Sequence, residues 1–307
     1  MQSPDSSSYL YFPLAGNSGL KSSVSPLLGG DCMLDQNSFV LQPCSVEDLH
    51  STKSSRNFWL AFGPGKAWSA CGVSAEAEAL KGSDEEEQVS LSAGLMWHKV
   101  SRYSPKYSLA SEITSFIPLG NVCVELMQVR ITNEGSAPIR FIPMSAIPLY
   151  ARSADNLRDH RHVTSLLHKV VISDEGVELT PSMSFDERGH RTNHRIYFVF
   201  GVDGVGHKPE SCCPSAADFV GEGGSYARPE QIYSLHKASE CWMSAGGQLN
   251  GEEVIGALRF AECSLEPGES SIWTLCIGTA EEGRLASDKE TILRDFLSDH
   301  SLSALKA

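Results

Sequence analysis

The chain has 307 residues, 41% hydrophobic and 21% charged, a composition typical of a globular protein with a large core. Its 25 Lys and Arg stand against 38 Asp and Glu, a formal net charge of -13. Proteins that wrap nucleic acid or dock on anionic lipid need a basic surface, so neither partner is expected. No apolar run reaches the roughly 18 residues of a membrane helix. The N-terminal segment lacks the basic and apolar regions of a signal peptide.

The cysteines are nine, an odd number, and their spacing is scattered. Most stand in apolar, strand-like contexts such as those of Cys123 and Cys276, where a free thiol behaves as a small hydrophobe. The vicinal pair Cys212-Cys213 is expected in a loop. No CxxC or paired metal-ligand spacing occurs, so we expect reduced thiols, a cytoplasmic location and no metal site.

Along the chain the hydrophobic pattern has a period close to two. The acidic run Leu80–Gln88 is expected to be a solvated turn between strands. Residues 122–134 alternate and are rich in β-branched side chains, which predicts a strand. After a turn, residues 138–150 are expected to return as a second strand. Pro143 and Pro148 place that strand at a sheet edge or at bulges.

Further turns and strands follow. Lys169–Ser173 and Val177–Phe185 flank Asp174-Glu175-Gly176, which indicates a hairpin. Arg195–Gly201 is expected to be a strand, and Gly201–Arg228, rich in Gly, Pro, Ser and Cys, a long loop.

The last pair of strands completes the pattern. Leu258–Leu265 and Ser270–Ile277 flank a Glu-Pro-Gly-Glu turn and are expected to pair antiparallel. Many antiparallel strands with almost no internal helix predict a large β-sandwich over residues 1–285.

The C-terminal end differs in kind. Ser287 to Glu290 fits a capping box, with Ser287 as the cap, and the apolar side chains that follow fall on one helical face: Ile292, Leu293, Phe296 and Leu297. Residues 286–307 are therefore expected to start a helix that leads toward a further, helical domain. The alternative is that this helix folds back onto its own sandwich.

The densest polar cluster runs from Arg152 to His162. Arg offers a planar fork for phosphate or carboxylate, while Asp, Asn and His suit hydroxyl groups, so the functional interpretation is a loop that recognises an oxyanion or a sugar. The structural interpretation is a salt-bridged surface loop. Strand spacing would put His160 and His162, with His168 farther on, on one face for a metal, but Arg158 and Arg161 would repel a cation.

Other candidate features are weaker. The cluster Phe185–His194 is expected to be a charged connecting loop that could approach the first cluster. Its adjacent acids Asp186 and Glu187 cannot flank a glycosidic bond from two sides. The Gly-rich string Phe219–Gly224 lacks the context of a phosphate loop and is expected to be flexible. A sugar-stacking platform is conceivable from three aromatic residues that more often lie in cores: Trp59, Trp68 and Trp97.

Several segments, in order and spacing, resemble the cellobiose and chitobiose phosphorylases (glycoside hydrolase family 94 and close relatives). The resemblance extends over roughly Tyr9 to Glu282, and it rests on these segments: Tyr11-Phe12-Pro13-Leu14, Ser22-Ser23, Gly30-Asp31, Arg56-Asn57-Phe58-Trp59, Trp68, Val124–Asn133 and Leu265–Ser270.

This resemblance implies an N-terminal β-supersandwich of the galactose-mutarotase type, followed in the family by linker helices and an (α/α)6 barrel. It implies an inverting phosphorolysis in which inorganic phosphate, the only co-substrate and no resident cofactor, attacks the anomeric carbon of a β-glucoside. One carboxylic acid then suffices to protonate the leaving oxygen. In the family that acid lies in the barrel, so no catalytic residue is assigned here.

The resemblance also implies a homodimer in which a loop of the sandwich reaches the partner's active site. By position this loop is Asn156–His162. The substrate-binding residues expected from it are Arg158, Asp159, His160, Arg161 and His162. The expected ligands are a β-linked glucoside or a sugar phosphate, from cellobiose to longer β-glucan oligosaccharides.

Two other classes stay open. An aldose-epimerase-like enzyme would need a His acid and a Glu base facing each other across a sugar. His160, His162 or His190 could be the acid, but the sequence places no Glu for it. A sugar-binding module without chemistry is the third class.

Overall fold

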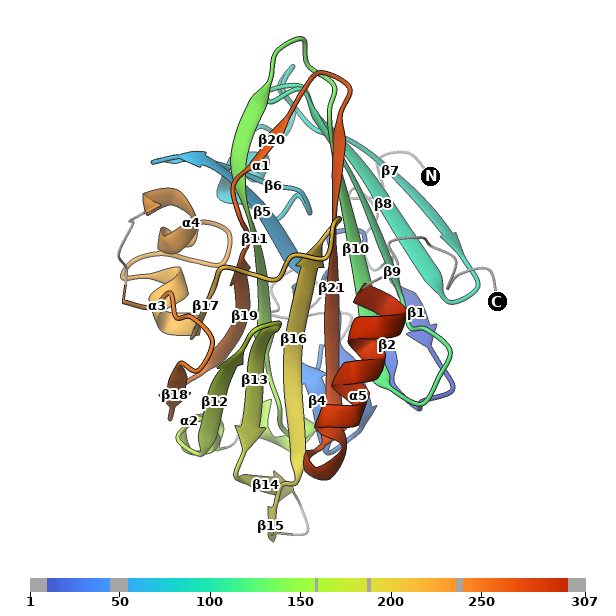
Figure 1. Cartoon of the computed structure of the whole chain (residues 1–307), viewed down its shortest axis with the longest axis vertical. Coiled ribbons are helices and arrows are strands. Elements are labelled where there is room, and N and C mark those ends of the chain that lie inside the picture. The colour runs from blue at the N-terminus through green and yellow to red at the C-terminus, as the bar shows by residue number, and fades with distance from the viewer. Residues whose placement is uncertain (1–9, 45–54, 158–159, 187–188, 236–239, 298–307) are drawn as a thin grey trace.

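The computed structural model describes residues 10–44, 55–157, 160–186, 189–235 and 240–297, and antiparallel strands dominate it (Figure 1). The largest sheet has nine strands. In spatial order they are β18 (Gln248–Asn250), β12 (His168–Ser173), β13 (Gly176–Pro181), β16 (Arg195–Asp203), β21 (Ser270–Glu281), β10 (Cys123–Asn133), β9 (Leu109–Phe116), β8 (Trp97–Ser104) and β7 (Gln88–Gly94).

Three smaller sheets complete the strands. The six-stranded sheet contains, in order, β17 (Ser211–Ser215), β19 (Val254–Arg259), β11 (Ile139–Leu149), β5 (Asn57–Gly63) and β6 (Lys66–Ser69), with β20 (Cys263–Leu265) beside β11. The four-stranded sheet is β1 (Phe12–Ala15), β2 (Lys21–Val24), β3 (Cys32–Asp35) and β4 (Ser38–Leu41). The two-stranded one is β14 (Met183–Asp186) and β15 (Gly189–Thr192).

The described helices are short. They are α1 (Ala75–Ala79), the 3₁₀ turn η3 (Ala154–Leu157), α2 (Arg161–Ser165), α3 (Ala216–Val220), α4 (Glu230–Ser234), the 3₁₀ turn η4 (Glu282–Arg284), α5 (Leu285–Thr291) and the π-helical turn η5 (Ile292–Leu297).

The main core lies between the nine-stranded and six-stranded sheets. Side chains of β10, β16 and β21 such as Val129, Val199 and Leu275 belong to the same buried cluster as Phe58 of β5 and Leu258 of β19. Two sheets packed face to face in this way make a sandwich, and the expected mainly antiparallel fold is confirmed.

The outer faces of both sheets are also covered. Helix α5 and η5 pack on the nine-stranded sheet, where Ile292 and Leu297 meet Phe198 and Phe200 of β16 (Figure 1). Helices α3 and α4 cover the six-stranded sheet around Trp59. Burial on both faces explains why β16 has no polar or charged side chain between Arg195 and Asp203 other than that of Tyr197.

The hairpin expected around Asp174-Glu175-Gly176 is confirmed as β12 and β13. Gly176 has a φ of 152°, and a Cβ there would lie 2.1 Å from the Val199 carbonyl oxygen, so only glycine fits this turn. The strands expected at 122–134 and 195–201 are confirmed as β10 and β16.

Two expected hairpins are instead crossings between the sheets. β10 pairs with β9 and β21, whereas β11 pairs with β5, β19 and β20. The chain crosses back to the nine-stranded sheet between β20 and β21. Two hydrogen bonds hold this crossing beside the β10–β11 turn: Gly268 N donates to Asn133 O at 2.7 Å, and Asn133 N donates to Glu269 O at 3.0 Å. The turns were placed correctly, but a turn does not show which strands pair.

The prolines were expected to put β11 at a sheet edge or at bulges, and the sheet edge is wrong. The strand lies between β5 and β19, and Pro148 lies opposite Ile255 of β19. On the side of β11 away from β5, Phe141 pairs with β20 and Met144 pairs with β19. Pro143 lies between these two residues, where the partner strand changes. The proline therefore occupies a break in the ladder, where its missing N–H costs little.

The long loop expected over 201–228 is wrong in part. Cys212 and Cys213 belong to the edge strand β17, opposite Leu258 and Ala257 of β19, and both are buried. The edge position, with a bulge between Cys213 and Ser215, accommodates Pro214, whose presence suggested a loop. All nine cysteines are free thiols, as expected.

The expected C-terminal helix is confirmed, but its capping box is not. Helix α5 starts at Leu285 with Arg284 as N-cap, and Ser287 lies inside it, donating from Oγ to Arg284 O at 2.9 Å. β21 runs directly into η4, so the helix begins before the Ser-Asp-Lys-Glu pattern. The alternative that the helix folds back onto its own sandwich matches the described residues.

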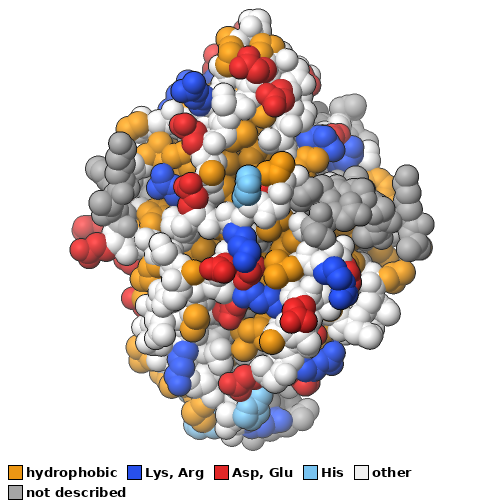
Figure 2. Space-filling view, in the orientation of Figure 1, with side chains coloured by type: hydrophobic (Ala, Val, Ile, Leu, Met, Phe, Trp, Pro, Cys, Tyr) orange, Lys and Arg blue, Asp and Glu red, His pale blue; other side chains and the backbone are white. Residues whose placement is uncertain are grey.

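The surface carries mixed charge. Figure 2 shows acidic and basic side chains interspersed over the face that bears α5. The turn 80–88 is largely exposed, as expected, except that Glu87 pairs with buried Arg102, Nη1 to Oε2 at 3.2 Å. In the described part of the chain, no helix is long and apolar enough to span a membrane.

Candidate functional site

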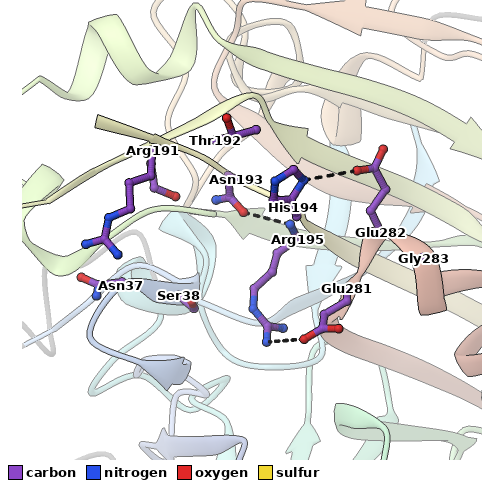
Figure 3. Close-up of a pocket in the computed structure, with 11 residues that line it drawn as sticks. Asn37, Ser38, Arg191, Thr192, Asn193, His194, Arg195, Glu281, Glu282 and Gly283 are labelled. Atoms are coloured by element: carbon purple, nitrogen blue, oxygen red, sulfur yellow. Dashed lines mark hydrogen bonds and ion pairs between the residues drawn. The ribbon is translucent and has the colours of Figure 1, made fainter. Parts of the chain in front are cut away.

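An open cleft of about 460 Å³ lies at one end of the sandwich (Figure 3). It is built from the β3–β4 turn, the β14–β15 hairpin, the start of β16 and the end of β21 with η4. Apart from Gly283, its lining residues are polar or charged: Asn37, Ser38, Ser184, Arg191, Thr192, Asn193, His194, Arg195, Glu281 and Glu282.

The backbone around the cleft is fixed. Glu282 N donates to His194 O at 2.8 Å, which joins the end of β21 to the start of β16. Asn193 Oδ1 accepts from Arg195 N at 2.9 Å and shapes the turn into β16. The walls are thus continuations of central strands, and rigid elements hold side chains more precisely than loops do.

The charged pairs in the cleft are loose. His194 Nδ1 lies 3.8 Å from Glu282 Oε2, and Arg195 Nη2 lies 3.9 Å from Glu281 Oε1. Both glutamates are mostly exposed, so solvent screens these pairs and they contribute little to stability. The same groups can therefore exchange their partners for the hydroxyl or anionic groups of a ligand at small cost.

Of the described candidate residues of the first polar cluster, none is among the residues that line this cleft, and Arg161 lines a separate, smaller pocket with Tyr226 and Glu253. Arg158 and Asp159 fall outside the described residues. His160 has a left-handed backbone (φ 60°), and its ring stacks on Phe185 of β14 at 6.3 Å. Arg161 starts α2 and donates to Glu253 Oε1 at 3.2 Å and Gln42 Oε1 at 2.9 Å, while His162 is exposed.

The buried side chain of Arg152 holds α2 in place through hydrogen bonds. Arg152 donates from Nε to Thr164 Oγ1 at 2.6 Å, and its Nη1 and Nη2 donate to both carboxylate oxygens of Glu253 at 3.2 and 3.0 Å. Burial by itself raises the pKa of Glu253, but the charges of Arg152 and Arg161 outweigh it and hold that pKa below its usual value. Ala151 and His160, directly before the two arginines, both have positive φ, which is strained backbone for such residues.

Replacing Glu253 with Gln is expected to loosen α2. The change leaves buried Arg152 without a counter-charge, and because Glu253 is one-third exposed we expect a loss of about 1–2 kcal/mol. Amide hydrogen exchange over residues 161–167 measures it. Glu252→Gln is the matched control, because that neighbouring carboxylate accepts a hydrogen bond from Ser215 Oγ of β17. Equal exchange in both variants would contradict this role.

The two polar clusters form one continuous surface. Ala154 N donates to Gln36 O at 2.9 Å and Ser153 Oγ lies 3.4 Å from Asn37 Oδ1, so η3 sits against the β3–β4 turn that lines the cleft. The stacking of His160 on Phe185 joins α2 to the hairpin. The expectation that residues 185–194 approach the first cluster is thus confirmed, although β14 and β15 form a hairpin rather than a loop.

Other expectations are corrected by the structure. His160 and His162 lie in a turn and a helix rather than on a strand, and His168 is buried, with Nδ1 2.9 Å from Glu252 O. Within the described ranges no group of three His, Cys, Asp or Glu side chains comes together. Trp59 and Trp68 are buried, so they are core residues and offer no sugar platform.

The comparisons with known proteins agree with this architecture. The family model described as "Glycosyl hydrolase 94, supersandwich domain" matches residues 43–294. The chain belongs to this family. The match starts just after β4 and ends inside η5, so the four-stranded sheet lies outside the matched residues.

Solved structures similar to this supersandwich are distant in sequence. A bacterial glucoamylase complexed with acarbose has a TM-score of 0.49 and 8% identity, covering 91% of this chain and 32% of its own. A galactose mutarotase-like protein from Lactobacillus casei has a TM-score of 0.43 and 8% identity, and the match covers 88% of this chain and 100% of that protein. A putative aldose 1-epimerase from Escherichia coli K12 has a TM-score of 0.40 and 10% identity, and the match covers 89% of this chain and 99% of that protein. The chain spans about a third of the glucoamylase, and no curated protein matches it.

Sequence reasoning missed several residues of this supersandwich's site. In the sequence, Glu253 is separated from Arg152 by 101 positions. Glu281 and Glu282 are likewise far along the chain from the β14–β15 hairpin, although they line the same cleft. None of these acids stands in a motif. The only sequence signal was that so many charges between Arg152 and His162 require counter-charges somewhere.

Proposed function

We propose that this chain is the N-terminal, non-catalytic supersandwich of an inverting β-glucoside phosphorylase that acts on cellobiose or β-glucan oligosaccharides. Residues 1–285 would form the sugar-facing scaffold, and residues 286–307 would begin the linker to a helical domain. The observation that supports it most is the polar cleft beside the β14–β15 hairpin, in which the two ion pairs His194–Glu282 and Arg195–Glu281 are loose.

The chemistry of the cleft suits a sugar and an oxyanion. Arg191 and Arg195 offer guanidinium forks for phosphate or hydroxyl oxygens, and Glu281 and Glu282 accept hydrogen bonds from sugar hydroxyls. Phosphate brings its own nucleophilic oxygen, so the reaction needs one carboxylic acid to protonate the leaving oxygen. We assign no such acid to this chain. Its share would be to bind and orient the glucoside and phosphate, and to supply part of a dimer interface through α2.

The cleft is expected to bind β-glucosides weakly, and removing its guanidinium groups should weaken binding at least tenfold. Each lost hydrogen bond to a charged group costs about 1.5–3 kcal/mol. The test is calorimetric or NMR titration of the chain with cellobiose and cello-oligosaccharides, with and without phosphate, comparing wild type with Arg191→Ala and Arg195→Ala. Arg140→Ala is the matched control, because Arg140 is exposed on β11 where β20 pairs, outside the cleft.

Activity assays on the chain alone distinguish this non-catalytic role from an enzymatic function of the chain itself. The 307 residues alone are expected to produce no sugar 1-phosphate from cellobiose and phosphate, and no change in glucose anomers by polarimetry. An epimerase needs its acid and base on opposite sides of the sugar, whereas His194 and Glu282 lie side by side. Phosphorolysis by the chain alone would overturn the non-catalytic assignment. Glycan binding that phosphate never affects would favour a simple sugar-binding module.

A further inference from the structure

A buried tyrosine lies directly behind the wall of the cleft. In β16, Arg195 lines the cleft and Tyr197 is the second residue after it, so both side chains lie on the same face of the sheet. Tyr197 is 0% exposed and belongs to the main core. It pairs with Leu179 of β13 and Thr279 of β21, so two neighbouring strands fix its position.

The hydroxyl group of Tyr197 is buried and has no hydrogen-bond partner among the described residues. Such a group loses the hydrogen bonds that it would make to water, which lowers the stability of the fold. A phenylalanine would fill the same space without this cost. The stability of the sandwich therefore gives no reason for a phenol at this position, and a functional reason is indicated.

Polar side chains of the cleft lie close to this hydroxyl. Burial raises the pKa of the Tyr197 phenol, whereas Asn193 and Ser38 beside it and the charge of Arg195 act in the opposite direction. All three of these residues line the cleft (Figure 3). The hydroxyl end of the ring thus faces the cleft, with polar neighbours near it and a bond to none of them.

Ser38 suits a hydrogen bond that forms only when a ligand is present. A serine hydroxyl can accept one hydrogen bond and donate another at the same time. Asn193 Oδ1, by contrast, already accepts from Arg195 N at 2.9 Å. In ligand-free proteins, the hydrogen bonds of a functional site are often long and tighten only in the complex.

We propose that Tyr197 is a positioning residue of the cleft, which directs the Ser38 hydroxyl at a sugar oxygen of the bound ligand. When the ligand binds, the Tyr197 hydroxyl donates to Ser38 Oγ, and the Ser38 hydroxyl donates to the sugar oxygen. Each hydrogen bond polarises the next, so the chain of two strengthens the contact with the ligand. This role rests on the proposed function, because it concerns the same cleft and the same β-glucosides.

Titration of the intact chain with cellobiose and cello-oligosaccharides tests this role, with the melting temperature measured on the same samples. Tyr197→Phe should raise the Kd about twofold to tenfold, the equivalent of one hydrogen bond between neutral groups. Its melting temperature should stay the same or rise, because a buried hydroxyl without a partner is removed.

Tyr233→Phe is the matched control for this titration. The Tyr233 hydroxyl is likewise buried without a partner, but it lies in the small core under α3 and α4, outside the cleft. This variant should bind the sugars as tightly as wild type does. A loss of affinity equal to that of Tyr197→Phe would overturn the proposal, because the effect would then not depend on the cleft.

A double variant separates positioning from a structural role. Ser38→Ala should weaken binding at least as much as Tyr197→Phe, and the two changes together should weaken it no further than Ser38→Ala alone. Additive losses would overturn the proposal. So would a Tyr197→Phe protein that unfolds or melts several degrees below wild type, since its hydroxyl would then stabilise the fold.

The wild-type titration distinguishes failure of this role from failure of the proposed function. If wild type binds cello-oligosaccharides and Tyr197→Phe binds them equally well, the role of Tyr197 is wrong and the sugar site stands. If wild type binds none of these sugars, the proposed function is wrong and the role falls with it.

Discussion

Replacing Arg56 with Met is expected to lower the free energy of unfolding by about 3–5 kcal/mol, because it leaves the buried carboxylate of Glu125 without a counter-charge. Both side chains are fully buried, and Arg56 Nε lies 2.5 Å from Glu125 Oε1. The same guanidinium also donates to Leu28 O, Gly30 O and Asp31 O at 3.1–3.2 Å. One side chain thus joins β5, β10 and the four-stranded sheet.

Urea unfolding at neutral pH measures this effect. The double variant Arg56→Met with Glu125→Leu should recover part of the loss, because two apolar groups replace the ion pair and no charge stays buried alone. Lys81→Met is the control, since its ion pair with Glu78 is exposed and should contribute less than about 1 kcal/mol. An Arg56→Met protein within about 1 kcal/mol of wild type would show that Glu125 escapes to water or takes up a proton.

The second large effect is loss of stability in mild acid. Burial, helped by the charge of Arg56, lowers the pKa of His98 to about 4, and burial, helped by Arg152, does the same for His168. The unfolded chain titrates its histidines near 6.5. The stability from these neutral rings is therefore complete above about pH 6.5 and declines as the pH falls toward 4. Each histidine contributes about 3 kcal/mol by linkage.

Urea unfolding at pH 7.0, 5.5 and 4.5 measures this decline. In the described chain neither ring nitrogen of His98 has a hydrogen-bond partner, so His98→Leu removes the titration without breaking a bond. This variant should lose about half as much stability as wild type over the same range. Carboxylates with lowered pKa, such as Glu253 and Glu175, act only below about pH 4.5. Equal slopes for wild type and His98→Leu would show that His98 is solvated in the fold.

The candidate site shows where sequence reasoning stops. The cluster from Arg152 to His162 stands out because charges so dense need partners, and His160 of this cluster stacks on Phe185 of the hairpin that lines the cleft. The same reasoning treated Arg152 as one more surface charge, although it is buried under α2 and paired with Glu253. A sequence shows that a charge must be neutralised but not which distant residue neutralises it, because the partner is chosen by strand order.

The strands, the turns and the terminal helix follow from the sequence alone, since period-two alternation and Gly or Pro turns are local properties. Family membership also follows, because the segments that carry it recur in a fixed order. Strand pairing was decided only by the tertiary structure: β10 and β11 are consecutive yet belong to different sheets. The cleft was decided in the same way, because Asn37, Arg195 and Glu281 meet only after the four-stranded and nine-stranded sheets have come together. Local interactions fix each element, whereas burial of both faces of each sheet fixes which elements become neighbours.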